Sequence, residues 1–168
     1  MNERAFYFMR HGQTDWNVEH RLMGQQDIPL NTLGKEQAKK AIQKVRDLNI
    51  GTIYTSPLKR ASETAQIIAG SLNIKIVILE NLKEVNFSIY EGTKIQTNFL
   101  DSWILGNINP VSGESFLDVY KRIQNIINKI QKQPARNLII SHGIIFLVIT
   151  NLLKKNIKLL KNTEIIKF

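Results

Sequence analysis

The stretch Phe8–Asn17, FMRHGQTDWN, joins a short apolar run directly to an arginine, a histidine and a glycine. A similar arrangement occurs at 137–143, where NLIIS leads into His142 and Gly143. Short apolar runs bounded by polar residues predict buried strands. In an open parallel sheet, ligands bind beyond the carboxyl ends of the strands, and glycine allows a sharp turn and close ligand approach. These two stretches therefore predict a sheet with both histidines at one edge.

Strands and helices are predicted to alternate along the chain, with a loop at 80–93. The expected strands are 4–9, 52–55, 75–79, 136–141 and 163–168, and the expected helices are 32–48, 57–72, 94–105, 115–132 and 143–155. Thr32 and Ser56 are the expected N-caps of the first two helices, and Pro57 opens the second. We therefore expect an α/β three-layer sandwich, with a mostly parallel central sheet covered by helices on both faces. Residues 1–168 are expected to form a single domain.

Composition limits the possible partners. The 168 residues carry a formal net charge of +9 and no cysteine, which excludes disulfides, thiolate catalysis and cysteine-ligated metal sites. The densest basic cluster, Lys154, Lys155, Lys158 and Lys161, is interpreted as a solvated helix face, so neither nucleic acid nor membrane is an expected partner. We expect a cytoplasmic protein that binds a small anionic substrate. The sequence leaves its oligomeric state open.

A third predicted strand, TIYT, leads to Arg60 in the first turn of the following helix. Arg10, His11 and His142 are expected at the same edge of the sheet. Guanidinium groups offer planar forks of donors that suit phosphate oxygens, and they repel a metal cation. A neutral imidazole among these donors can attack phosphorus and form a phosphoenzyme. A metal site built on both histidines and a carboxylate is the chemical alternative, but it lacks close-spaced histidines.

Over its whole length the chain resembles the histidine phosphatase superfamily, also called phosphoglycerate mutase-like, in its broad-specificity or α-ribazole-phosphatase-like branch. The nucleophile signature is matched by RHGQTDWN (10–17), and the acid loop by LKEVNFSIYEG (82–92). The other matching segments, in chain order, are GQQDIPLNTLGKEQA (24–38), YTSPLKRASETAQII (54–68), SGES (112–115), ISHG (140–143) and LKNTEIIKF (160–168).

The resemblance implies a role for each matching residue. His11 would be the phosphorylated nucleophile, and Glu84 the proton donor that later activates water. The implied ligands of the phosphoryl group and substrate are Arg10, Asn17, Met23, Gly24, Arg60, His142 and Gly143. Neither a metal nor another cofactor is implied. The resemblance thus implies a metal-independent phosphomonoester hydrolase acting on a small phosphorylated metabolite.

The chain departs from the family pattern around the outer pocket. Ser88 and Tyr90 stand where the acid loop usually has glycine and tryptophan. Met23 occupies a place where relatives often carry a polar residue. The specificity of the pocket is therefore left open.

Some residues and reactions keep alternatives. Glu80 and Glu91 lie near Glu84, Glu114 is interpreted as supporting a turn or helix start, and Asn17 as a possible cap of its loop, which Thr14 is expected to order. The aromatic side chains expected in the core are Phe87, Tyr90, Phe99 and Trp103. His20 is interpreted as a loop residue. A phosphoglycerate mutase is the alternative enzyme, although residues 85–113 are short and contain only Lys94 as a cation. A non-catalytic phospho-ligand binding protein is the third reading.

Overall fold

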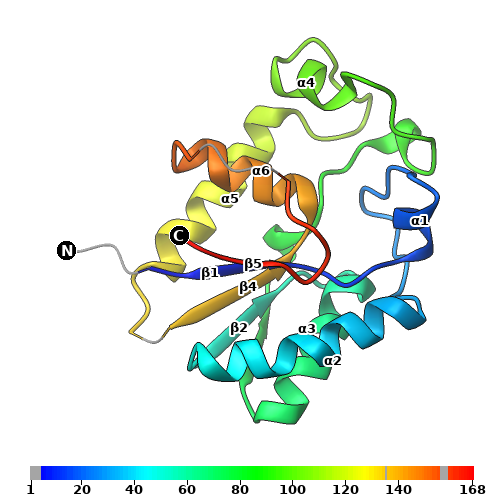
Figure 1. Ribbon diagram of the computed structural model, residues 1–168. Coiled ribbons are helices and arrows are strands. Elements are labelled where there is room, and N and C mark those ends of the chain that lie inside the picture. The colour runs from blue at the N-terminus through cyan, green and yellow to red at the C-terminus, as the bar shows by residue number, and fades with distance from the viewer. Residues whose placement is uncertain (1–4, 135, 156–158) are drawn as a thin grey trace.

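The computed structural model describes residues 5–134, 136–155 and 159–168 (Figure 1). Arg4 of the first predicted strand and Lys158 of the basic cluster lie outside these ranges. Within the described part of the chain, five strands form one sheet in the order β3-β2-β4-β1-β5. Their bounds are β1 (Tyr7–Arg10), β2 (Thr52–Thr55), β3 (Lys75–Ile78), β4 (Asn137–Ser141) and β5 (Ile165–Lys167). The first four strands are parallel, and β5 runs antiparallel to β1.

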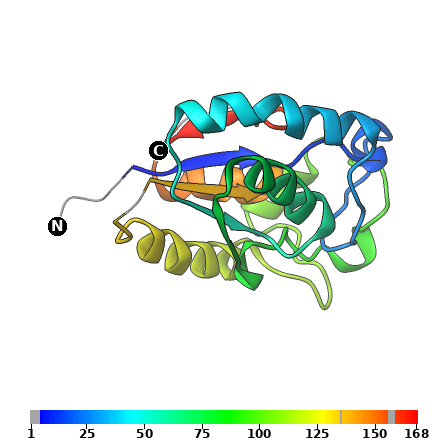
Figure 2. The same cartoon turned by 90° about the horizontal axis from the view of Figure 1, so that it is seen from below.

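Helices cover both faces of the sheet, as the sequence predicts. Figure 1 shows α2 and α3 below the sheet and α5 and α6 above it, and Figure 2 views the molecule from the side of α2 and α3. The helices are α1 (Asp15–Val18), α2 (Thr32–Asp47), α3 (Lys59–Leu72), α4 (Phe99–Ile104), α5 (Phe116–Ile130) and α6 (Gly143–Leu152), with 3₁₀ turns η1 (Glu80–Leu82) and η2 (Ser88–Tyr90).

Alternation of side chains along the central strands divides the core into two. Phe8 and Ile139 belong to the hydrophobic cluster that includes residues of α5 and α6. Their neighbours Met9 and Ile140 belong to the cluster formed with α2 and α3. Because successive side chains of a strand point to opposite faces, a strand between two helical layers is apolar at every position. This burial explains the continuous apolar runs in the sequence.

Two predicted helix starts are wrong. Asn31, not Thr32, caps α2, and its Oδ1 accepts a 2.8 Å hydrogen bond from the backbone of Gly34. Helix α3 begins at Lys59 instead of Pro57, and its cap position, Leu58, makes no side-chain capping bond. Ser56 lies two residues before the cap position, and its hydroxyl lies against a buried histidine, described below.

The segment before α4 also differs from the prediction. A helix was expected over 94–105, but Lys94 forms an isolated antiparallel bridge with Arg21, and Asn98 has a positive φ of 65°. Both features prevent helix from forming before Phe99. The aromatic residues nearby do form core, since Phe87, Phe99 and Trp103 are buried and Tyr90 packs against them. No helix in the described ranges is long and apolar enough to span a membrane.

Candidate active site

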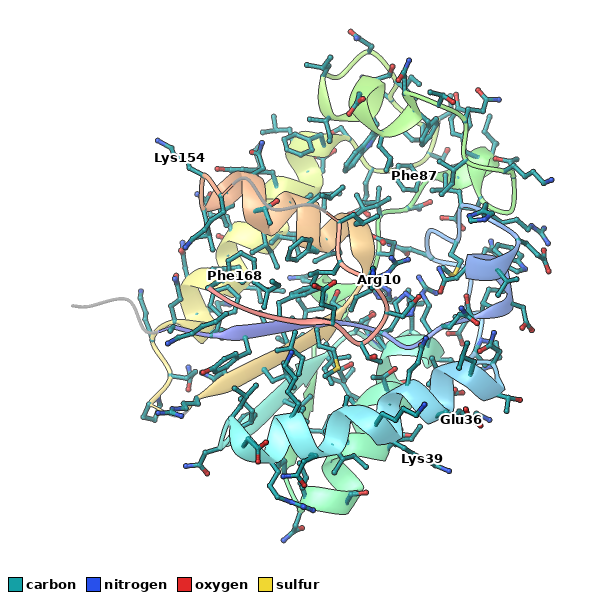
Figure 3. All side chains as sticks on the ribbon, in the orientation of Figure 1. Arg10, Glu36, Lys39, Phe87, Lys154 and Phe168 are labelled. Atoms are coloured by element: carbon teal, nitrogen blue, oxygen red, sulfur yellow. The ribbon has the colours of Figure 1, made fainter. Side chains whose placement is uncertain are left out.

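Neighbouring strands bring polar residues to one edge of the sheet. β1 ends at Arg10 and is followed by His11, while β4 ends at Ser141 and is followed by His142. Arg10 pairs with Ser141 in the parallel register, so the two histidines lie side by side with ring centroids 5.3 Å apart. Arg60 lies at the start of α3, which follows β2, the neighbour of β4 on the side away from β1. Figure 3 labels Arg10 at this edge.

The ring of His11 is held in one tautomer. Its side chain is buried, and Nδ1 lies 2.7 Å from the carbonyl oxygen of Gly12. A carbonyl oxygen only accepts, so in the neutral ring Nδ1 carries the hydrogen and Nε2 keeps its lone pair. Burial, and then the charges of Arg60 and Arg10, lower the pKa of His11 well below its usual value, against the opposing hydrogen bond to Gly12. His11 is therefore a neutral base with Nε2 available.

His142 is held by a hydroxyl group. Its Nε2 lies 2.8 Å from Oγ of Ser56, which also accepts a 3.2 Å hydrogen bond from the backbone N–H of Leu58. When the hydroxyl donates to Nε2, the hydrogen of the neutral ring is on Nδ1, a buried atom without a hydrogen-bond partner among the described residues. Burial, followed by Arg60 and His11, lowers the pKa of His142 well below its usual value. A neutral His142 thus offers one N–H donor.

Arg60 is fully buried and fixed by two backbone carbonyls. Nη1 donates to Gln26 and Nη2 to Gly24, both at 2.8 Å. Burial lowers the pKa of Arg60 to about 10, against the opposing effect of nearby carboxylates, Glu84 foremost. The guanidinium is therefore charged at neutral pH, and its buried Nε has no partner in the described part of the chain.

Arg10 supplies a second guanidinium. Nη1 donates to the carbonyl of Leu160 at 2.9 Å, while the buried Nε is unpaired among the residues described. Burial lowers the pKa of Arg10, and Glu84 opposes that shift. Two fixed guanidiniums with unengaged N–H groups suit the oxygens of a phosphoryl group.

Glu84 adds a buried carboxyl group close to Arg60. Oε1 accepts a 3.0 Å hydrogen bond from the backbone N–H of Val85, and Oε2 a 3.1 Å bond from Ile144 in the first turn of α6. Burial raises the pKa of Glu84, against the lowering effects of the Ile144 hydrogen bond and of Arg60. Burial thus makes Glu84 easier to protonate than a carboxylate in water, as suits a proton donor.

The two other acidic candidates have different surroundings. Glu80 pairs with Lys83 at 2.7 Å, and its side chain is 71% exposed. Glu91 accepts backbone hydrogen bonds from Gln25 (2.9 Å) and Phe87 (3.0 Å), which join two loops. Of the three carboxylates, Glu84 alone lines the cavity.

Asn17 both caps a helix and lines the cavity. Oγ1 of Thr14 accepts from the Asn17 backbone (3.2 Å), and Oδ1 of Asn17 accepts from the Thr14 backbone (3.1 Å), which is a capping box for α1. Asn162 donates to the carbonyl of His11 (2.9 Å) and to Oδ1 of Asn17 (3.3 Å). The loop after the nucleophile candidate is therefore fixed by side chains, as expected for Thr14.

A cavity of about 80 Å³ is lined by most of the site residues predicted from the sequence. Its lining includes Arg10, His11, Asn17, Met23, Gly24, Arg60, Glu84 and Gly143. His142 lies beside it, against His11. In the described ranges, no three His, Cys, Asp or Glu side chains are grouped so as to hold a metal ion.

Residues 6–166 match the sequence model of a known family, the histidine phosphatase superfamily (branch 1). The chain belongs to this superfamily. It is therefore an enzyme of the phosphatase or mutase type, and the resemblance seen in its motifs is confirmed at the level of the family.

Relatives of the chain are named as phosphatases or as phosphoglycerate mutases. It is 36% identical over 141 residues to an uncharacterized phosphatase, PhoE, of Bacillus subtilis, covering 83% of this chain and 72% of the relative. It is 33% identical over 148 residues to a probable phosphoglycerate mutase, GpmB, of Enterobacter sp., covering 82% and 69%. A solved phosphoserine phosphatase from Entamoeba histolytica, in complex with 3-phosphoglyceric acid, superposes with a TM-score of 0.81 at 28% identity, covering 98% and 89%.

The mouth of the site in this superfamily member is mostly apolar but includes a third arginine. Ile95, Leu100 and Leu159 line it, together with Arg21. Arg21 stacks over the ring of Trp16 at 4.0 Å from the centroid. Its Nε donates to the carbonyl of Gly92 at 2.6 Å. The sequence analysis did not single out Arg21, because its position at the mouth depends on the fold of residues 90–95.

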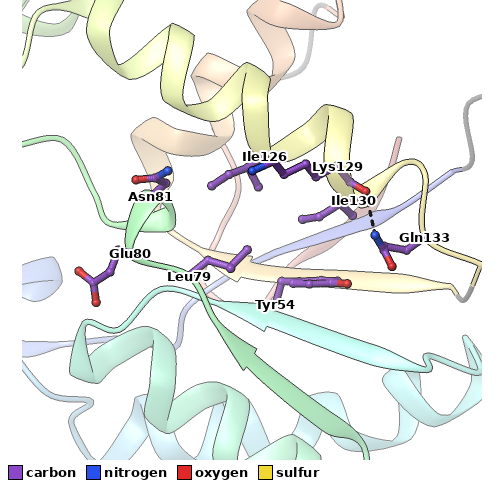
Figure 4. A pocket seen from close by; sticks show the side chains of 8 residues that line it. All are labelled: Tyr54, Leu79, Glu80, Asn81, Ile126, Lys129, Ile130 and Gln133. Atoms are coloured by element: carbon purple, nitrogen blue, oxygen red, sulfur yellow. Dashed lines mark hydrogen bonds between the residues drawn. The ribbon is translucent and has the colours of Figure 1, made fainter.

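A second cavity of about 270 Å³ lies between α5 and the β2–β3 side of the sheet (Figure 4). Its lining is Tyr54, Leu79, Glu80, Asn81, Ile126, Lys129, Ile130 and Gln133. Arg10, His11, Arg60, Glu84 and His142 do not border it; of the acidic candidates, only Glu80 does. We therefore expect the chemistry of the superfamily in the smaller cavity.

Besides Arg21, sequence reasoning missed the contacts of three residues around the site. Ser56 was interpreted as a helix cap, yet it contacts His142, a position indicated by the pairing of β2 with β4. Glu114 was interpreted as supporting a turn or helix start, but α5 is capped by Ser115 and Asp118. The Glu114 carboxylate pairs with Arg122, whose role carried no local signal in the sequence.

Proposed function

We propose that this protein is a metal-independent phosphomonoester hydrolase that works through phosphorylated His11. The observation that carries the proposal is the buried, neutral imidazole of His11, whose Nδ1 is tied to Gly12 at 2.7 Å and whose pKa is lowered by burial and by the charges of Arg60 and Arg10. The lone pair at Nε2 can attack phosphorus without a prior deprotonation step. The substrate is a small phosphorylated metabolite.

In the first step, Nε2 of His11 attacks phosphorus as the bond to the leaving oxygen breaks. Glu84 gives its proton to that oxygen, so the product alcohol leaves neutral and Glu84 becomes a carboxylate. Arg10, Arg60 and the Nδ1–H of His142 bind the phosphoryl oxygens and stabilise the charge spread over them in the transition state.

In the second step, the Glu84 carboxylate takes a proton from a water molecule whose oxygen attacks phosphorus. The phosphorus–nitrogen bond breaks, His11 regains its lone pair, and inorganic phosphate leaves. Glu84 ends protonated and ready for another turnover. One residue thus serves as acid and then as base, which its raised pKa supports.

The rate of hydrolysis of p-nitrophenyl phosphate in EDTA tests the proposal. His11→Ala should lose about 10³-fold or more, because it removes the proposed nucleophile. His20→Asn, a change at an exposed loop histidine, is the matched control and should keep wild-type activity. Brief reaction with substrate should label wild type, but not His11→Ala, with an acid-labile phosphate. Activity abolished by EDTA, or retained by His11→Ala, contradicts the mechanism.

A mutase is the second candidate, favoured by Arg21 at the mouth and by the probable phosphoglycerate mutase among the relatives. In that reaction the phosphohistidine transfers its phosphoryl group to a second hydroxyl of a carboxylate-bearing substrate. Interconversion of 3- and 2-phosphoglycerate faster than release of phosphate would replace the hydrolase proposal. The apolar wall formed by Ile95, Leu100 and Leu159 supports hydrolysis of an ester with an uncharged leaving group.

A further inference from the structure

Arg122, on α5, holds the backbone on which Glu84 is mounted. Its Nη1 donates to the carbonyls of Asn81 (2.6 Å) and Lys83 (2.9 Å), and Nη2 donates to the carbonyl of Glu84 itself (3.3 Å). One guanidinium thus fixes three peptide units in a segment that has no regular secondary structure after η1. The planar geometry of the group makes these directions specific.

Glu114 completes the attachment from the other side of Glu84. Its two oxygens accept from Nε (2.7 Å) and Nη2 (3.0 Å) of Arg122, a bidentate ion pair. Oε2 also accepts from the backbone N–H of Asn86 at 2.9 Å. The pair therefore binds carbonyls up to Glu84 and an amide two residues after it.

A structural role at the start of α5 does not account for this pair. The capping box of α5 is formed by Ser115 and Asp118, so the helix start does not need the carboxylate of Glu114. The side chains of Arg122 and Glu114 are only 15% and 23% exposed, and taking them from water carries a desolvation cost. That cost is offset by the ion pair and by the hydrogen bonds to the acid loop.

The carboxyl group of Glu84 depends on its backbone for position. In the described part of the chain, its hydrogen bonds come from two backbone amides, those of Val85 and Ile144, and from no side chain. A shift of the 81–86 segment would therefore move the carboxyl group relative to α6 and to His11. Small displacements of a catalytic group lower a rate sharply, because proton transfer needs hydrogen-bond distance.

Gln25 connects the same cluster to the phosphate side of the cavity. Its Nε2 donates to the carbonyl of Glu84 at 3.1 Å and lies 3.5 Å from Oε2 of Glu114. The preceding residue, Gly24, accepts from Arg60. The acid loop and the loop that anchors Arg60 are thus joined through one amide side chain.

We propose that Arg122 and Glu114 are positioning residues that place the carboxyl group of Glu84 for proton transfer to the leaving oxygen. This inference rests on the hydrolase proposed above. Neither residue lines the cavity, so both act through the backbone of Glu84 and not on the substrate.

A comparison of leaving groups tests the inference, because proton donation matters most for a poor leaving group. Arg122→Gln should lower kcat/KM, which reports the first step alone, by roughly 10- to 100-fold for phenyl phosphate and by less than about threefold for p-nitrophenyl phosphate. Glu114→Gln should show the same pattern, and it provides a second test if Arg122→Gln folds poorly. Lys121→Gln removes an exposed cation from the same helix and should leave both rates unchanged.

A double variant shows whether Arg122 acts through Glu84. Glu84→Gln alone should lose more on phenyl phosphate than on p-nitrophenyl phosphate, and adding Arg122→Gln should cost less than about twofold more. Equal losses on both esters in Arg122→Gln and Glu114→Gln, or fully additive losses in the double variant, would overturn the inference and leave the hydrolase proposal intact. A wild type that hydrolyses neither ester would overturn both.

Discussion

Ser88 adopts a backbone conformation that usually belongs to glycine. Its φ is +53°, and in the family pattern glycine usually stands at this position of the acid loop. A side chain in the left-handed region costs roughly 1–2 kcal/mol, which glycine avoids. Serine in place of glycine at this position therefore carries a cost in conformational free energy. The loop is held by contacts such as the 2.9 Å hydrogen bond from the Ser88 N–H to the side chain of Asn86.

Ser88→Gly should raise the free energy of unfolding by about 1 kcal/mol, because it removes this conformational cost. Urea denaturation measures the change. Ser88→Ala is the matched control, since it deletes the hydroxyl but keeps the β-carbon, and it should not stabilise the protein. Equal stabilisation by both variants would show that the hydroxyl, and not the positive φ, carries the cost.

The residues of the site differ in how far the sequence could predict them. Arg10 ends β1, and His11 and His142 directly follow β1 and β4, so strand ends in a parallel sheet were enough to place them together. Glu84 needed the family resemblance, because loop carboxylates give no periodic signal. Arg122 lies on the helix with the clearest apolar pattern, and nothing in the local sequence marks it, because its contacts are with a loop distant in the chain.

The start of α2 packs closely against the loop that follows the nucleophile candidate. A β-carbon built on Gly34 would collide with the backbone of Gln13, and one built on Gly12 would lie 2.5 Å from the carbonyl oxygen of Gly34. Contact between two backbones cannot be relieved by turning a side chain. The two glycines therefore set the distance between α2 and the His11 loop.

Gly34→Ala should destabilise the fold by about 1–3 kcal/mol and lower kcat, because the helix or the loop must move. Gly70→Ala is the matched control on α3, where nothing lies within 4 Å of the added carbon. There alanine should stabilise by up to about 1 kcal/mol through its better helix propensity. Denaturation curves and rates on p-nitrophenyl phosphate measure both effects. If the two variants gain stability alike, the close approach does not constrain the loop.

The elements could be predicted where their signal is local. Helices α2 and α5 were expected within about two residues of their bounds, since their apolar faces repeat at helical spacing. The start of α3 was wrong by two residues, because its cap position is Leu58, which makes no side-chain capping bond and gives no signal in the sequence. Strand order and the antiparallel direction of β5 depend on pairing between distant segments, which no local pattern encodes.

Across the whole molecule, the site concentrates buried titratable groups in one place. His11 and His142 are held neutral, and the charged groups that act on them are Arg60, Arg10 and, for His142, Arg122. Glu84 is buried with its pKa raised. Such groups bind a different number of protons in the folded and unfolded chains, so they make stability depend on pH.

Stability should fall as pH drops from about 6.5 towards 5. The unfolded chain takes up protons at His11 and His142 in this range, whereas their lowered pKa values keep both neutral when folded, which costs up to about 1.4 kcal/mol per pH unit for each. Glu84 acts oppositely, because its raised pKa makes the folded chain bind the extra proton above about pH 4.5. Two histidines outweigh one carboxyl group, so the net slope follows the histidines.

Urea denaturation between pH 5 and 7 measures this slope and separates the groups. His142→Asn should flatten it by removing one histidine, and Glu84→Gln should steepen it by removing the opposing carboxyl group. His20→Asn, the exposed control, should reproduce the wild-type slope. A wild-type slope retained in His142→Asn would mean that His142 is protonated in the folded protein, and a neutral donor at this position would then have to be abandoned.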